Sequence, residues 1–163
     1  IDFSDTSSQE VAEKTYRTWT FRGMGAWAGW SMPWASVLQT HVGNADAAAL
    51  MLRLWDGYFC NPGHGSRHDA YRPGLSVCRR GKNAQALGVC GDAPGEDIMQ
   101  MDGQCASAAA VLELMAHEVN GETKFFRGCP DEWMEVSFEN LSLPDGSRVS
   151  GSRINGVTRT FHK

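Results

Sequence analysis

The chain has 163 residues, of which 42% are hydrophobic and 10% aromatic, which is enough to bury the core of one ordinary domain. Its formal net charge is −4, and its lysines and arginines are scattered along the sequence, which argues against a nucleic-acid partner. No apolar run approaches the roughly 20 residues that a membrane-spanning helix needs, so we also expect no membrane partner.

The first part of the chain predicts three helices that follow one another with short connections. Ser31 is the expected cap of the second helix, with Pro33 in its first turn, and Asn44 is the expected cap of the third. Each helix has one apolar face, which is typical of antiparallel helical hairpins. The expected helices cover residues 7–22, 31–43 and 45–59.

A region of different character follows at residues 60–95, where glycine, proline and charged residues are frequent and no periodicity is sustained. A loop of this length in a compact domain usually carries function or is disordered. Cys60, Cys78 and Cys90 lie in it, and one local disulfide could form there in an oxidising compartment. No CxxC pair is present, so we predict no metal site and no cofactor.

The segment 96–117 looks central to the chain. It begins with alternating residues, reaches a carboxylate at Asp102, turns at Gly103 and continues as a helix of small residues that should end near Gly121. The apolar residues that recur there at helical spacing predict its buried face. They are Ala108, Val111, Leu112 and Met115.

Beyond residue 121 the hydrophobic period changes to two, which predicts about four strands. The run 144–146, Pro-Asp-Gly, is the expected hairpin turn between two of them. Helices followed by strands predict the α+β class, with helical hairpins first, a small antiparallel β segment last, and a domain boundary near residue 121.

Three tryptophans fall at positions 27, 30 and 34, a spacing that would place them on one face of a helix. We assign Trp34 to the core. For Trp27 and Trp30 two interpretations stay open, because indole rings in a Gly-flanked loop also make flat platforms for the apolar faces of sugar rings.

Two histidines, His64 and His68, have the spacing of metal ligands on a helix. Pro62, Gly63 and Gly65 argue against a helix there, and the HExxH pattern is missing. We therefore expect both imidazoles to be solvated or to meet a ligand hydroxyl rather than a metal.

Acidic residues gather around Asp102, namely Glu96 and Asp97, with Gln100 between them and Asp102. In an alternating segment Gln100 and Asp102 point the same way, and an amide beside a carboxylate suits hydroxyl recognition or the activation of water. The structural alternative is that Asp102 is only a helix N-cap, which is the commoner role of such an aspartate. No nucleophile elbow, P-loop or GxGxxG motif is present.

An ordered series of motifs resembles glycoside hydrolase family 95, the α-L-fucosidase type. AGWSMPW at 28–34 and VGNADAAALML at 42–52 resemble that family's GWS-x-x-W…GD-x-x-A pattern. MQMDGQCASAAAVLELM at 99–115 resembles its QIDGN-x-G-x-x-x-G-I-x-E-M-L segment. PDEW and PDGSRVSGSRINGV are similar to its return into a C-terminal β domain. The resemblance covers about residues 10–160.

The resemblance implies that residues 1–120 are the C-terminal part of an (α/α)6-barrel catalytic domain, which the chain alone cannot close. It implies that residues 121–163 belong to a β-sandwich-like domain. It carries Asp102 onto the base-side aspartate of an inverting hydrolysis. The sequence departs from the family at Glu96, where a histidine is usual, and at Gln104, where an asparagine is usual. No segment matches the one that supplies the general acid.

We therefore expect a portion of a glycoside hydrolase, inactive in isolation, whose partners are carbohydrate and the missing N-terminal part of the same enzyme. The chain begins with Ile1 and has no basic-then-apolar leader, so we interpret its start as a processed end or the edge of a fragment. The compartment stays open, with an extracellular or periplasmic location as the expectation. The expected substrate-binding residues are Trp27, Trp30, Gln100, Glu96, His64 and His68.

Two other classes of function remain as alternatives. The first is a non-catalytic carbohydrate-binding or scaffold domain, in which the tryptophans and Asp102 only hold sugar. The second is a stand-alone helical interaction domain with a sealed core. Apolar helix faces left exposed would argue against a sealed core, because large apolar patches are unusual on a monomer.

Overall fold

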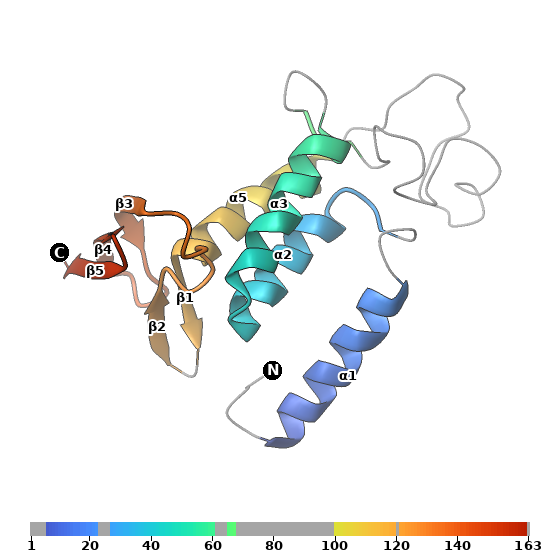
Figure 1. The fold of residues 1–163 in the computed structure, drawn as a ribbon, viewed down its shortest axis with the longest axis horizontal. Coiled ribbons are helices and arrows are strands. Elements are labelled where there is room, and N and C mark those ends of the chain that lie inside the picture. Colours follow the sequence, from blue (N-terminus) through green and yellow to red (C-terminus); the bar gives the residue numbers. More distant parts are fainter. Residues whose placement is uncertain (1–5, 23–26, 61–64, 68–99, 120, 163) are drawn as a thin grey trace.

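The computed structural model describes residues 6–22, 27–60, 65–67, 100–119 and 121–162, and has four helices and five strands in these ranges (Figure 1). The helices are α1 (Thr6–Arg22), α2 (Ser31–Val42), α3 (Ala45–Phe59) and α5 (Met101–Met115). The strands are β1 (Ala116–Val119), β2 (Glu122–Phe125), β3 (Glu135–Ser142), β4 (Arg148–Ile154) and β5 (Val157–His162). The predicted α+β class is confirmed, whereas the barrel origin of the hairpins stays a prediction.

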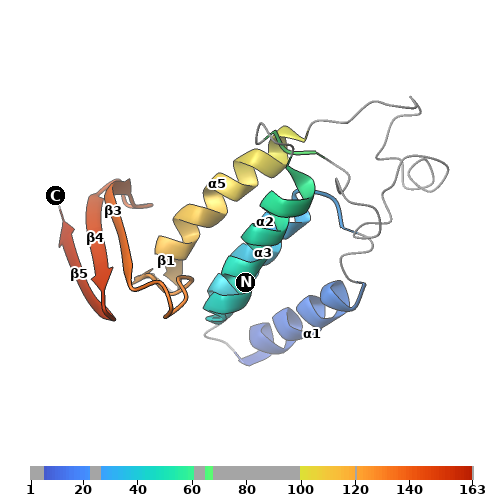
Figure 2. The ribbon, with the colours of Figure 1, turned by 45° about the horizontal axis from the view of Figure 1, so that its top comes forward.

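Helices α2, α3 and α5 lie side by side, with the sheet of β3, β4 and β5 beyond α5 and with α1 on the other side of the α2–α3 pair (Figures 1 and 2). The turn between α2 and α3 is as short as predicted. Gly43 ends α2 in the left-handed conformation at φ 81°, and the Asn44 side chain caps α3 by accepting the Ala47 N–H at 3.2 Å. None of the helices in the described ranges has the length and apolar character to cross a bilayer.

Two buried clusters hold these elements together. The first joins the helices: Trp27, Met32, Ala35 and Phe59 form its centre, and Trp19 of α1 packs against it. The second joins helices to strands, because Ala48 of α3 and Leu114 of α5 contact Phe126 and Cys129 beyond β2. Side chains from both sides of residue 121 therefore share one core.

The strands form two antiparallel sheets. One is the β1–β2 hairpin, and the other is a meander in the order β3-β4-β5 with a bulge between Phe138 and Leu141. The predicted turn at 144–146 is confirmed: Leu143 N–H donates to Ser147 O at 2.9 Å, and Gly146 has φ 84°. The next turn, Asn155–Gly156, has φ 49° and 79°, the two positive values of a type I′ hairpin.

Two expectations about α5 are wrong. The helix ends at Met115 rather than near Gly121, because the next four residues pair with β2 as β1. Its buried residues are Gly103, Ala110 and Leu114, whereas Val111 and Leu112 of the predicted buried face are 41% and 50% exposed. Apolar residues are spread around this helix with polar ones between them, so the hydrophobic period could not select the face that packs.

Candidate functional site

The candidate site lies where the N-terminal ends of α2 and α5 meet. Trp30 is the residue that precedes α2, and Gln100 is the residue that precedes α5. The Trp30 N–H donates a hydrogen bond to the Gln100 Oε1 over 2.8 Å. A Cβ atom at Gly103 would lie only 3.5 Å from the Trp30 nitrogen, so the first turn of α5 is in close contact with the start of α2.

Gln100 acts as the link at this junction rather than as a surface group. It is 8% exposed, and its N–H donates to the Ser66 carbonyl at 3.0 Å, while the Ser66 hydroxyl donates to the Gln100 carbonyl. Its side-chain oxygen is bonded to the backbone of Trp30. The substrate contact expected of Gln100 would therefore compete with this internal bond.

Asp102 is exposed and lies within the first turn of α5, inside the helix and not on a turn before it. The N-cap alternative is also wrong, since the cap position is held by Gln100, which makes no side-chain capping bond. The expected common face is wrong too, because Gln100 is buried while Asp102 is exposed. The first turn of α5 places this side chain at the positive end of the helix dipole.

The structure separates the three tryptophans. Trp27 is 6% exposed and stacks on Trp19 with ring centroids 4.1 Å apart, so it belongs to the core. Trp30 is 40% exposed and Trp34 is 45% exposed, with ring centroids 6.1 Å apart. The assignment of Trp34 to the core is wrong, because the residues of α2 that pack into the buried cluster are Met32 and Ala35.

The remaining expected site residues, Glu96, His64 and His68, lie outside the described residues, as does the acidic neighbour Asp97. Within the described residues, no group of three or more His, Cys, Asp or Glu side chains could hold a metal ion.

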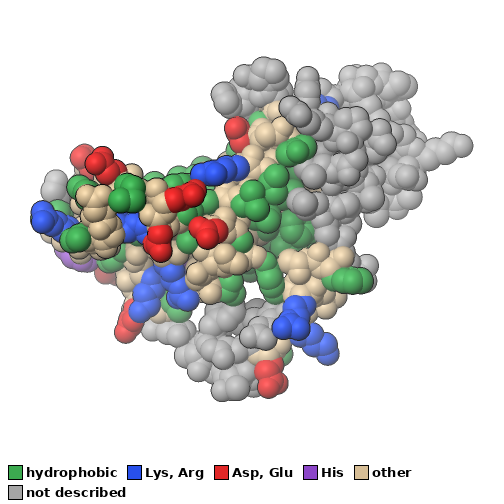
Figure 3. All heavy atoms as spheres, in the orientation of Figure 1, with side chains coloured by type: hydrophobic (Ala, Val, Ile, Leu, Met, Phe, Trp, Pro, Cys, Tyr) green, Lys and Arg blue, Asp and Glu red, His purple; other side chains and the backbone are tan. Residues whose placement is uncertain are grey.

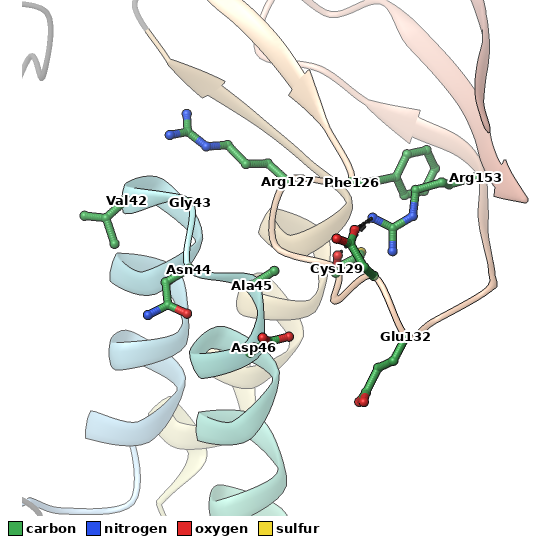
Figure 4. Close-up of a pocket in the computed structure, with 11 residues that line it drawn as sticks. Val42, Gly43, Asn44, Ala45, Asp46, Phe126, Arg127, Cys129, Glu132 and Arg153 are labelled. Carbon is green, nitrogen blue, oxygen red and sulfur yellow. Dashed lines mark hydrogen bonds and ion pairs between the residues drawn. The ribbon is translucent and has the colours of Figure 1, made fainter. Parts of the chain in front are cut away.

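A first hollow that the sequence did not indicate lies between the α2–α3 turn and the segment after β2, with a volume of about 700 Å³ (Figure 4). Arg127 and Arg153 line it together with Asp46 and Glu132. Arg153 is turned toward the backbone, because its guanidinium donates to Cys129 O at 2.9 Å and to Pro130 O at 2.5 Å. In the space-filling view, acidic and basic side chains mix over the strand part while hydrophobic ones gather over the helices (Figure 3).

A second hollow of about 460 Å³ lies at the other end of the α2–α5 pair from Trp30 and Gln100. His41, Glu113 and His117 line it, and His41 Nε2 lies 3.0 Å from Glu113 Oε2. The two rings lie close, with centroids 4.7 Å apart. The i, i+4 spacing of Glu113 and His117 was a signal in the sequence, but its partner His41 lies 72 residues away from Glu113.

No model of a known protein family matches the chain, and no curated protein matches it. The fold and site therefore define the chain as an α+β protein in which two exposed indoles and a carboxylate share one end of a helical layer. Any function must be argued from these residues.

Proposed function

We propose that this chain binds carbohydrate at the junction of α2 and α5, as a portion of a glycoside hydrolase of the α-L-fucosidase type. The observation that carries the proposal is the exposure of Trp30, Trp34 and Asp102 at the N-terminal ends of α2 and α5. Gln100, two residues before Asp102, accepts the Trp30 N–H, and Gly103, directly after Asp102, lies close to the same nitrogen. The exposed indoles and the acid therefore lie at the same end of the helical layer, at the N-terminal ends of α2 and α5.

Each side chain has a distinct part in the proposed site. An exposed indole face stacks on the C–H face of a sugar ring, and its N–H serves as a hydrogen-bond donor. Asp102 accepts hydrogen bonds from sugar hydroxyls or from a water molecule held beside them. In an inverting hydrolysis that carboxylate is the base that activates water, with an acid about 6.5–9.5 Å away on the other side of the bond. The resemblance assigns that acid to a segment that this sequence does not match.

The exposed apolar residues of the helices support a role as part of a larger helical assembly. Met101, Val111 and Leu112 of α5 are 62%, 41% and 50% exposed, and Leu50 of α3 is 48% exposed. An apolar helix face is usually packed against another element. Further barrel helices, as expected from the resemblance, would cover these residues.

The test is binding of fucosylated oligosaccharides to the purified chain, measured by isothermal titration calorimetry. Trp30→Ala should weaken binding by about tenfold or more, which corresponds to 1.4 kcal/mol. Phe161→Ala is the matched control, because Phe161 is an aromatic residue on β5 that is 64% exposed. Absence of binding, or equal loss in both variants, would contradict the proposal.

Asp102→Asn separates the enzyme from the non-catalytic alternative. Binding that survives Asp102→Asn but fails on Trp30→Ala would favour a carbohydrate-binding or scaffold domain. We expect no hydrolysis of a chromogenic α-L-fucoside by the chain alone. Turnover that is abolished by Asp102→Asn would show instead that the chain is a complete catalyst.

A further inference from the structure

The second hollow borders a buried histidine whose hydrogen bonding is incomplete. His117 lies in β1 directly after α5 and is 4% exposed. Its Nδ1 lies 3.0 Å from the Glu113 backbone oxygen. Since a carbonyl only accepts, Nδ1 carries the hydrogen, and Nε2 of the neutral ring has a lone pair. That Nε2 is buried and has no hydrogen-bond partner among the described residues.

The charges around His117 come from α2, α5, the β1–β2 hairpin and the segment after it. Glu113 favours a protonated His117, but its carboxylate is already bonded to His41 Nε2 at 3.0 Å. His41 on α2 and Arg127 after β2 both disfavour it. Lys124 is the β2 residue that pairs with His117 across the hairpin. The charged or titratable side chains facing this position are therefore Glu113, Glu118, His41, Lys124 and Arg127.

Protonation of His117 is unfavourable in this setting for two reasons. The second ring N–H would be a buried donor without an acceptor, and the new cation would lie against the His41 ring, whose centroid is 4.7 Å away. Burial is accordingly the main cause that lowers the pKa of His117 from its ordinary value of 6.5.

We propose that His117 and His41 form an acid-sensitive joint between the helices and the β1–β2 hairpin, which opens when His117 is protonated. His117 belongs to the hairpin and His41 to α2, so the two neighbouring rings, tilted by 34° to each other, lie on the two sides of the joint. The hollow beside them, lined further by residues 141–144, gives water a route to the buried ring once the joint loosens.

The direction of the pH effect follows from the neutral ring. A group whose folded pKa is depressed contributes stability that is complete above its unfolded pKa, here about 6.5, and that is lost as the pH falls toward the folded pKa. The equilibrium constant for opening should therefore rise by up to about tenfold for each pH unit below that value, until the folded pKa is reached.

The first test measures the pH dependence of the unmodified chain. NMR titration of the His117 ring between pH 4.5 and about 8 should give a midpoint below 6.5 and the Nδ1–H tautomer above it. Amide exchange, corrected for its intrinsic pH dependence, should lose protection first at Phe126, whose N–H donates to Met115 O across the joint. A midpoint at or above 6.5, or a loss spread evenly over all amides, would overturn the proposal.

His117→Gln supplies the second readout, because an amide cannot gain a proton in this range. The variant should lose most of the pH dependence of Phe126 protection, whereas His162→Gln, at an exposed histidine of β5, should keep it. Full pH dependence in the His117 variant would overturn the proposal. If that variant fails to fold, the titration of the unmodified chain decides.

Discussion

The side-chain oxygen of Gln100 accepts the backbone N–H of Trp30 at 2.8 Å, across a sequence separation of 70 residues. This one bond ties the start of α5 to the start of α2, and so fixes Asp102 relative to the exposed indoles. Ser66 completes the junction through two hydrogen bonds to the Gln100 backbone. The geometry of the candidate site thus depends on the buried side-chain amide of Gln100, which does not itself lie on the surface.

Replacement of Gln100 by Leu should loosen this junction. The Trp30 N–H would lose its acceptor in a partly buried position, at a cost of about 1–3 kcal/mol in the free energy of unfolding. Urea denaturation measures the change in the free energy of unfolding, and amide exchange shows which N–H groups lose protection. The Trp30 N–H should lose protection more than the Trp34 N–H, which donates to Trp30 O within the same helix. Equal protection of the Trp30 N–H in both proteins would contradict the role given to Gln100.

Arg153 should be a major source of stability in the strand part. It is 8% exposed and donates to Cys129 O, Pro130 O and, at 3.4 Å, Trp133 O. Arg153→Met would leave these carbonyls without their charged donor and should lower the free energy of unfolding by about 3 kcal/mol. Arg159→Met, at an exposed arginine of β5, is the control and should change it by less than about 0.5 kcal/mol. Similar midpoints in urea for both variants would show that the buried bonds contribute little.

Gly128 should tolerate no side chain. A Cβ atom there would lie 2.5 Å from Thr40 Oγ1 and 2.9 Å from Leu114 Cα, so this segment would have to shift away from α2 and α5. Gly128→Ala should cost about 1–3 kcal/mol by this overpacking. Gly57→Ala makes a matched comparison, because Gly57 lies in α3 with no atom within 4 Å of its added Cβ. That change should stabilise by about 0.5–1 kcal/mol through helix propensity, and thermal denaturation of both variants checks the opposite signs.

The three cysteines of the described residues should differ in reactivity. Burial, aided by the charge of Asp56, raises the pKa of Cys60 to about 11, and burial raises that of Cys129 to about 11 against the opposing effect of Arg153. At pH 8 only about one such thiol in a thousand is ionised. Iodoacetamide should therefore label the exposed Cys105 first. Peptide mapping in native buffer and in urea would reveal the difference, which should vanish on unfolding.

The parts of the fold that the sequence predicted are those set by neighbouring residues. Gly43 and Asn44 mark the end of α2 and the start of α3 because a left-handed glycine and a capping amide act within one turn. The turn at 144–146 is local in the same way. The turn between β4 and β5 is local as well, because Asn-Gly is the strongest short hairpin motif and Asn155–Gly156 forms this turn.

The parts that could not be predicted depend on distant contacts. Trp34 has the spacing of a core residue, but which face of α2 packs is decided by α3 and α5, not by α2 itself. β1 exists because β2 pairs with it, so the residues after Met115 leave the helix. In the candidate site, the exposure of Trp30 and Asp102 could be predicted from the sequence. The internal role of Gln100 was not, because its acceptor atom meets a backbone 70 residues away.

The meander of β3, β4 and β5 has a consequence for the order of folding. Each strand pairs only with the next one along the chain, through two tight turns, so little loop entropy is spent when the sheet closes. The hydrogen bond between Trp30 and Gln100 requires closure of a far longer loop than either hairpin turn, because the two residues are 70 positions apart. Local contacts generally form faster than remote ones, and we expect the C-terminal sheet to assemble early, with the contact between the N-terminal ends of α2 and α5 completed last.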